Sequence, residues 1–325
     1  MAYLLLLLGI VLGLAAFWLG RRGRNTRRVR YGVAAALITL LAVAALISGG
    51  YEFWRTHLPI PPNWSEDIFQ GVTYIRDVRD EPRPLVIHIA RIDLHAAGVE
   101  LVVTPPDSSG GMDVLARTTS GFLAEFGVQV AINASYFEPW WSRALWDYYP
   151  HVGDPARVYG LAAAGGVTYG EPAEGFPSLY VTRDLVASIG TLPDGEVYNA
   201  VSGNHSLLED GEMPDFTPND YQAALHPRTA VALDRSGRIL LLVVVDGRQP
   251  NYSEGVTLPE LAEIIRQYNG YDALNLDGGG SSTLVVQGTD GQPRILNSSI
   301  DNNIPGRERP VAVQLGVRAL PLAEG

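Results

Sequence analysis

Two long apolar runs open the chain, and shorter apolar runs fill the rest of it. Residues 2–20 and 31–51 carry no charged side chain, and each run is close to the roughly 20 residues that a helix needs to cross a membrane. The ten residues between them, 21–30, hold six arginines. Short arginine-rich loops stay in the cytoplasm. We therefore predict two transmembrane helices, a cytoplasmic loop and an extracytoplasmic body.

Two other interpretations of these runs stay open, namely a cleaved signal peptide and a buried helical hairpin. The first run lacks a small-residue cleavage site before the arginines, whereas the second run could serve as a signal segment with the arginines before it. A signal peptide would also export the body. Residues 52–66 include three prolines, so we expect them to form an extended linker beside the membrane.

Residues 67–325 are predicted to form one β-rich mixed α/β (α+β) domain. Short apolar or alternating runs between glycine and proline are typical of strands, and they lack the regular alternation with helices of a doubly wound sheet. A helix is favoured where an N-cap residue such as Thr257 precedes a periodic run that ends at Gly270. We expect strands over 71–78, 84–94, 99–105 and 128–133, helices over 119–127 and 257–270, a hairpin over 228–247 and a strand–glycine turn–strand unit over 273–288.

Composition excludes several chemistries. The chain has no cysteine, and all 24 of its basic residues are arginine. It therefore has no thiol nucleophile, no thiolate zinc site, and no lysine for a phosphate-binding loop or a Schiff base. Residues 51–325 hold 18 arginines against all 35 acidic residues, and an acidic body argues against nucleic acid as a partner.

The run Leu-Asn-Leu-Asp-Gly-Gly-Gly-Ser-Ser-Thr, residues 274–283, is the strongest local signal. Its three glycines let the backbone approach a ligand closely, and their amides can surround an anionic oxygen. Strand alternation places Asn275 and Asp277 on one face. The alternative is a tight turn in which Asp277 is only the turn former.

Other polar residues also follow or precede apolar strands, where sites are commonly assembled. Asp246 and Arg248 follow one strand, Arg228 and Thr229 begin another, and Asn133 ends a third. The stretch 136–149 adds seven aromatic residues, which can stack on sugars, form a cap or contact a bilayer.

These motifs, in this order, resemble the phosphodiester glycosidase family over about residues 70–318. They are Asn133 in AINASYF, SGNHSLLEDG at 202–211, Pro227-Arg228-Thr229, VVVDGR, the helix after SEGVTLPEL, ALNLDGGGSST and RERPVAVQLGV. The resemblance implies hydrolysis of the bond between a sugar and a phosphodiester, here in envelope or exopolysaccharide-type glycans. Where family members usually read Asn-Gly-Gly-Phe-Phe, this chain has Ala134 and Ser135 in place of the glycines, which narrows the approach of a sugar to the backbone.

The residues suit that reaction. Planar guanidinium groups bind phosphate in pairs of hydrogen bonds, and carboxylates stabilise positive charge on a sugar or activate water. We expect no required cofactor, with Ca²⁺ as a candidate ion for the carboxylates and Asn133. A non-catalytic glycan-binding protein and a sugar-phosphate transferase remain alternatives. The predicted catalytic residues are Asp246, Asp277 and Glu254, and the predicted substrate-binding residues are Asn133, Asn204, His205, Arg228, Thr229, Arg248, Asn275, Gly278, Gly279, Gly280, Ser281 and Arg309.

Overall fold

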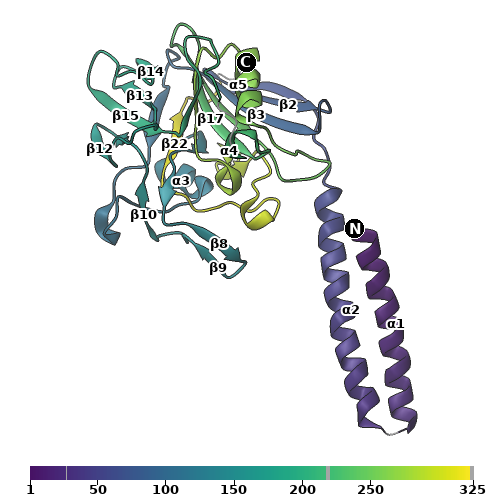
Figure 1. Cartoon of the computed structure of the whole chain (residues 1–325). Coiled ribbons are helices and arrows are strands. Elements are labelled where there is room, and N and C mark those ends of the chain that lie inside the picture. Colours follow the sequence, from purple (N-terminus) through teal and green to yellow (C-terminus); the bar gives the residue numbers. More distant parts are fainter. Residues whose placement is uncertain (27, 217–219, 323–325) are drawn as a thin grey trace. The chain divides into compact units, whose positions relative to one another are not determined.

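A computed structural model of the chain describes residues 1–26, 28–216 and 220–322. It separates the chain into two units, residues 1–60 with 250–252 and residues 61–249 with 253–325 (Figure 1). Each unit has its own packing, and the candidate functional residues belong to the second.

Two helices, α1 (Ala2–Thr26) and α2 (Val29–Thr56), run side by side in the first unit. Glycines let them approach closely, since a Cβ on Gly9 would lie 2.6 Å from Leu46 Cγ and one on Gly49 would lie 2.9 Å from Leu6 Cγ. Both helices are long and apolar enough to cross a membrane, judged by length and composition. Membrane insertion itself stays a prediction.

The helices extend beyond the predicted spans, which corrects two boundaries. The predicted loop 21–30 is mostly helical, because arginine is a good helix former and nothing before Thr26 breaks the helix. The predicted linker 52–66 is also too long. Helix α2 continues to Thr56 and strand β1 begins at Trp64, so the proline-containing connection is confined to residues 57–63.

The second unit contains a seven-stranded sheet in the order β1-β2-β3-β18-β17-β19-β16, in which the pairs are antiparallel. One face is covered by helix α5 (Leu258–Gln267) through Leu261 and Ile265. The strands are β1 (Trp64–Phe69), β2 (Val72–Arg79), β3 (Leu85–Asp93), β18 (Ile239–Val245), β17 (Arg228–Leu233), β19 (Asp272–Asn275) and β16 (His205–Leu208).

The opposite face of this sheet packs on a five-stranded sheet, and the largest hydrophobic core includes residues of both. Helix α3 (Thr119–Phe126) covers the second sheet with Phe122 and Leu123. Its strand order is β21 (Pro293–Ile295), β20 (Leu284–Gln287), β6 (Val130–Asn133), β22 (Gln314–Arg318) and β4 (Glu100–Val103).

Smaller elements surround these two sheets. Another five-stranded sheet contains β12 (Val167–Tyr169), β11 (Ala162–Ala164), β15 (Val197–Ser202), β13 (Ser178–Thr182) and β14 (Ala187–Ile189). A three-stranded sheet contains β5 (Val114–Leu115), β10 (Pro155–Val158) and β7 (Phe137–Glu138). A hairpin joins β8 (Trp141–Ala144) and β9 (Asp147–Tyr149), and the short helices are α4 (Asp220–Ala223), η1 (Ser108–Gly110), η2 (Gly279–Ser281) and η3 (Asp301–Asn303).

Most predicted elements are present. The hairpin 228–247 is β17 and β18, and Thr257 caps α5 with a reciprocal bond to Glu260. The helix ends earlier than predicted, because Asn269 rather than Gly270 takes the left-handed conformation, with φ 65°. The strand–turn–strand unit is not a hairpin. Strands β19 and β20 belong to different sheets, so the glycine turn carries the chain from one sheet to the other.

Candidate active site

Several strand ends meet at the junction between the two main sheets. Strand β17 is antiparallel to β18 and β19, so its first residues lie at the ends of both: Arg228 pairs with Val245, the last residue of β18, and Ala230 pairs with Asn275, the last residue of β19. Asn133 ends β6 in the other sheet, where its side chain donates to the Asp277 backbone oxygen (2.5 Å) and accepts from Thr229 Oγ1 (2.9 Å). The predicted strand-end residues are therefore brought together.

A pocket of about 440 Å³ opens at this junction. Among its described lining residues, three are arginines and one, Asp277, carries a carboxylate. The lining residues are Tyr136, Phe137, Trp140, Ser142, His226, Arg228, Arg248, Asp277, Gly278, Gly279, Gly280, Asn302, Asn303 and Arg309.

Arg228 is held by backbone oxygens at the base of the pocket. Its side chain is buried, with Nε donating to Val256 O (3.2 Å) and Nη2 to Ala224 O (3.0 Å). These two backbone carbonyls help to fix the direction of the guanidinium. Arg228 is also one of the residues that line the pocket.

Arg248 follows β18 in a left-handed backbone conformation, with φ 58°. Its Nη2 donates to Nδ1 of His226 (3.3 Å), and since a guanidinium only donates, the proton of a neutral His226 lies on Nε2. Burial, together with Arg248 and Arg228, lowers the pKa of His226 to about 4. The ring is therefore neutral at pH 7.

Arg309 is fixed from two sides. Its Nε donates to Asp301 Oδ1 (2.9 Å), and its guanidinium lies 5.1 Å from the centre of the Trp140 ring. Burial lowers the pKa of Arg248, and the charges of Arg309 and Arg228 lower it further. Like charges are thus crowded around one pocket, an arrangement that an anionic ligand would stabilise.

The three glycines give these arginines room. A Cβ on Gly279 would lie 3.1 Å from Arg248 Nη2, and one on Gly280 would lie 2.6 Å from Arg309 Nη2. The prediction that all three amides bind an anion is wrong in part, because the Gly279 amide donates to Pro227 O (2.8 Å) and the Gly278 amide to the Asp277 carboxylate. The glycines act mainly through the space that they leave.

Asp277 is half-buried beside these cations. Its backbone amide donates to Ala134 O (2.9 Å), and its carboxylate accepts from Ser281 Oγ and the Gly278 amide. Burial raises the pKa of Asp277 to about 6, although Ser281 and Arg309 oppose this shift. A carboxyl group with this pKa can exchange a proton near neutral pH, as a general base requires.

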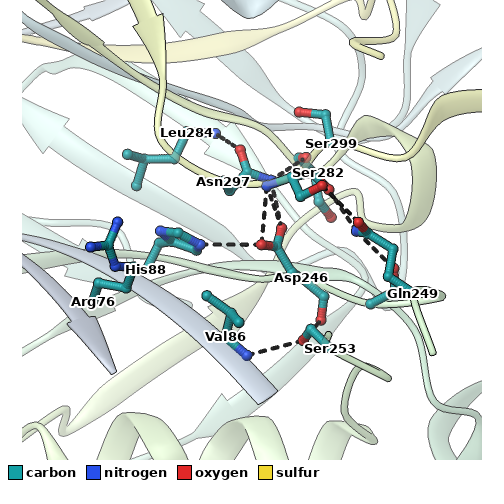
Figure 2. Close-up of polar contacts among 12 residues, drawn as sticks. Arg76, Val86, His88, Asp246, Gln249, Ser253, Ser282, Leu284, Asn297 and Ser299 are labelled. Carbon is teal, nitrogen blue, oxygen red and sulfur yellow. Dashed lines mark hydrogen bonds and ion pairs between the residues drawn. The ribbon is translucent and has the colours of Figure 1, made fainter. Parts of the chain in front are cut away.

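The predicted partner carboxylates lie elsewhere. Asp246 is buried outside the pocket lining and accepts from His88 and Asn297 (Figure 2). It also accepts from the Ser298 amide. Glu254 is exposed and does not line the pocket. Asp246 and Asp277 are both predicted to be catalytic because each follows an apolar strand, but the side chain of Asp246 turns towards residues 297–298 instead.

Five other predicted residues do not line the pocket, namely Asn133, Asn204, His205, Thr229 and Asn275. Asn133, Thr229 and Asn275 are buried. Asn275 Nδ2 donates to Asn204 Oδ1 (2.7 Å) and to the hydroxyl of Tyr136 (3.1 Å), which lines the pocket. His205 lines a neighbouring hollow with Phe176 and Glu209. Contact between substrate and Asn204 or His205 is therefore not supported by their positions.

Some lining residues were not among the predicted set. Tyr136, Phe137 and Trp140 come from the aromatic stretch, which did signal a role, whereas Asn302 and Asn303 had no sequence signal.

Ala134 and Ser135, which replace the two glycines usual in the family, do not narrow the pocket, because both side chains are buried and Ser135 Oγ accepts from the Ser202 amide. Among the described residues, no group of three or more His, Asp or Glu side chains is placed to hold a metal ion.

The fold is that of a β-rich α+β protein, and its pocket is lined by three arginines and, among the described residues, by one carboxylate of raised pKa. The chain belongs to the phosphodiester glycosidase family, whose model matches residues 126–318. It is 38% identical over 105 residues to the N-acetylglucosamine-1-phosphodiester alpha-N-acetylglucosaminidase of Bos taurus and 48% identical to that of Mus musculus. These matches cover 32% of this chain and 19% of each relative.

Two solved structures are similar in fold. The catalytic domain of the zebrafish enzyme of the same name, auto-inhibited by its pro-peptide, has a TM-score of 0.56 at 20% identity, over 81% of this chain and 85% of that one. A hypothetical protein from Synechocystis has a TM-score of 0.54 at 17% identity, over 79% of this chain and 64% of that one.

Proposed function

We propose that the chain hydrolyses the glycosidic bond between a sugar and a phosphodiester. The observation that carries this proposal is the pocket lined by Arg228, Arg248 and Arg309. Among its described lining residues, Asp277 alone carries a carboxylate. Family membership supports the same reaction class.

The arginines are assigned to the phosphodiester. Its negative charge would relieve the repulsion among the three guanidinium groups, and planar guanidinium groups match phosphate oxygens in geometry. As the bond from the anomeric carbon to the phosphate oxygen breaks, the bonding electrons pass to that oxygen. The arginines stabilise the charge that develops there, so the leaving group needs little help from an acid.

Asp277 is assigned to the sugar side. When the leaving phosphate withdraws, positive charge develops on the sugar ring, and water adds to the anomeric carbon. An ionised Asp277 stabilises that charge or accepts the proton of the attacking water. Trp140, which is 56% exposed and forms part of the wall, is assigned to stacking on a sugar face.

The proposed setting is the outer side of the cytoplasmic membrane, with the chain anchored in the bilayer by α1 and α2. The six arginines of residues 21–30 support this orientation. Envelope or exopolysaccharide-type glycans that contain sugar phosphodiesters are the proposed substrates.

The test uses the full chain in detergent with a panel of sugar-1-phosphodiesters, and it measures released reducing sugar. We expect release from at least one member of the panel and loss of release in Asp277→Asn. Tight binding without release from any member would contradict hydrolysis and favour a non-catalytic glycan-binding protein. An equal rate in Asp277→Asn would remove Asp277 from the mechanism.

A further inference from the structure

We infer that Asp246 is a positioning residue that holds two of the three pocket arginines in place. This inference rests on the proposed function, because it assigns Asp246 to the same site without contact with the substrate. Its carboxylate is buried and joins the segment of Asp246 to the segment of Asn297 (Figure 2). The first segment leads to Arg248 and the second to Arg309.

The carboxylate of Asp246 is satisfied by donors from three directions. His88 Nε2 lies 3.2 Å from Oδ2, Asn297 Nδ2 lies 3.0 Å from Oδ1, and the Ser298 amide lies 2.9 Å from Oδ1. A buried carboxylate is costly unless such donors surround it. These contacts therefore fix its position, and a group held in this way is unsuited to meeting water or substrate.

His88 links Asp246 to Tyr74. An ionised carboxylate only accepts, so Nε2 of His88 carries a proton. In the tautomer that is protonated at Nε2 alone, Nδ1 accepts from the hydroxyl of Tyr74 at 2.8 Å. Burial raises the pKa of Tyr74 to about 12, which keeps this donor protonated. Hydrogen bonds thus run from Tyr74 through His88 to Asp246.

The first segment is the loop that follows β18. Asp246 precedes Gly247 and Arg248, and its backbone oxygen accepts from Ser253 Oγ (2.6 Å). Gln249, fully buried, donates from Nε2 to Ser298 O (2.9 Å) and accepts from Ser298 Oγ (2.7 Å). Arg248 therefore stands between two residues that are both tied to residues 297–298.

The second segment runs from Asn297 to Asn303. Asn297 is also bound to the strand that follows the glycine turn, through Ser282 O (3.1 Å) and the Leu284 amide (2.9 Å). Four residues further along, Asp301 accepts from Arg309. Release of the Asp246 carboxylate would free the start of a segment that orients Arg309.

The hydrogen-bond chain suggests a discriminating substitution. In Asp246→Asn the amide oxygen can still accept from Asn297 and Ser298. The new NH₂ group can donate to His88 Nε2, after which Nδ1–H donates to Tyr74, because a neutral imidazole has two tautomers. The asparagine variant keeps the connection to residues 297–298 through Oδ1 and loses the charge and the second contact of the Ser298 amide, at 3.0 Å from Oδ2. Asp246→Ala removes the whole connection.

The experiment measures the binding of inorganic phosphate and the kinetics of a sugar phosphodiester with the full chain. We expect Asp246→Ala to weaken phosphate binding and raise KM by about tenfold or more, since misplacement of a binding group by about 1 Å is costly. We expect Asp246→Asn to stay within about threefold of the wild type in KM and kcat. Asn297→Ala cuts the same connection from the other side and should also weaken phosphate binding.

Leu261→Ala is the matched control, because it opens a cavity in the core between helix α5 and the seven-stranded sheet. It should lower the melting temperature and leave phosphate affinity unchanged. Wild-type phosphate affinity in Asp246→Ala and Asn297→Ala would overturn the positioning role alone. A hundredfold loss of kcat in Asp246→Asn at normal phosphate affinity would overturn it in favour of direct catalysis. A wild-type chain that binds no phosphate would overturn the proposed function together with this inference.

Discussion

The surroundings of Asp277 in the folded protein disfavour ionisation of its carboxyl group. Burial raises its pKa to about 6, so the folded protein holds the proton more tightly than the unfolded chain. The resulting contribution to the free energy of unfolding is fully present below about pH 4 and is lost as the pH rises through about 6. This shift of the Asp277 pKa corresponds to a contribution of at most about 3 kcal/mol to the free energy of unfolding.

Asp277→Asn should therefore separate catalysis from stability. The neutral amide keeps the shape of the side chain and avoids the cost of a buried charge, so we expect a melting temperature at pH 7 equal to or above that of the wild type. We expect kcat to fall by about 10²-fold or more. Calorimetry and steady-state kinetics on one preparation check both; normal kcat with a lowered melting temperature would indicate a turn former instead.

The same carboxyl group sets the expected pH profile. If the ionised form is required, kcat/KM should rise as the pH increases through about 6 and level off above it. His226, whose pKa is lowered to about 4, stays neutral over this range and does not produce this rise. A pH–rate series from 4.5 to 8 measures the midpoint, and a flat profile would show that Asp277 does not control the rate.

Gly280 tests the idea that the glycines leave space for arginines. Its added methyl in Gly280→Ala would lie 2.6 Å from Arg309 Nη2, so Arg309 must leave Asp301 or Trp140. We expect KM to rise by about tenfold, kcat to change less, and stability to fall by about 1 kcal/mol. Unchanged KM in the folded variant would disprove the spatial role. Gly280 is preferred to Gly279 because its backbone conformation suits alanine.

Among the elements, β18 shows why much of the fold was predictable. Its seven residues are all apolar because alternate side chains face different cores. Leu240, Leu242 and Val244 pack between the sheets, while Leu241 and Val243 pack under α5. Such a run predicts a strand buried on both faces. It does not predict which core is formed with which partner, because that depends on distant segments.

The arrangement of the site could also be predicted only in part, because it too depends on segments that are distant in the sequence. Local pattern placed Arg228, Arg248 and Asp277 at strand ends, and the structure brings all three to the pocket. It did not separate Asp277 from Asp246, because the direction of a side chain just beyond a strand depends on tertiary hydrogen bonds. The same holds for Asn302 and Asn303, whose positive φ angles of 53° and 59° are set by the turn that they occupy.

Helix α5 offers a test of stability at the level of one element. Thr257 Oγ1 accepts from the Glu260 amide, and the Glu260 side chain accepts from the Thr257 amide. Thr257→Ala should destabilise the protein by about 1 kcal/mol, whereas Thr257→Ser should be near neutral. Chemical denaturation measures both. Activity should be unchanged in each variant, and a loss of activity at full stability would contradict a purely structural role.

At the scale of the whole chain, the proposed topology has a direct test. A reporter that is active only in the cytoplasm should be silent when fused after Leu320 and active when fused after Arg24, because the arginines keep residues 21–30 inside. Reporter activity at Leu320 would place the body in the cytoplasm and exclude extracellular glycans as substrates.

The turn between β17 and β18 lies at the end of these strands remote from Arg228. Six residues of strand span about 20 Å, and the turn residue Ser236 is exposed. Because the chain has neither cysteine nor lysine, Ser236→Cys would give a single thiol for a fluorophore or for attachment to a surface. Such a label would report on ligand entry by energy transfer without entering the pocket.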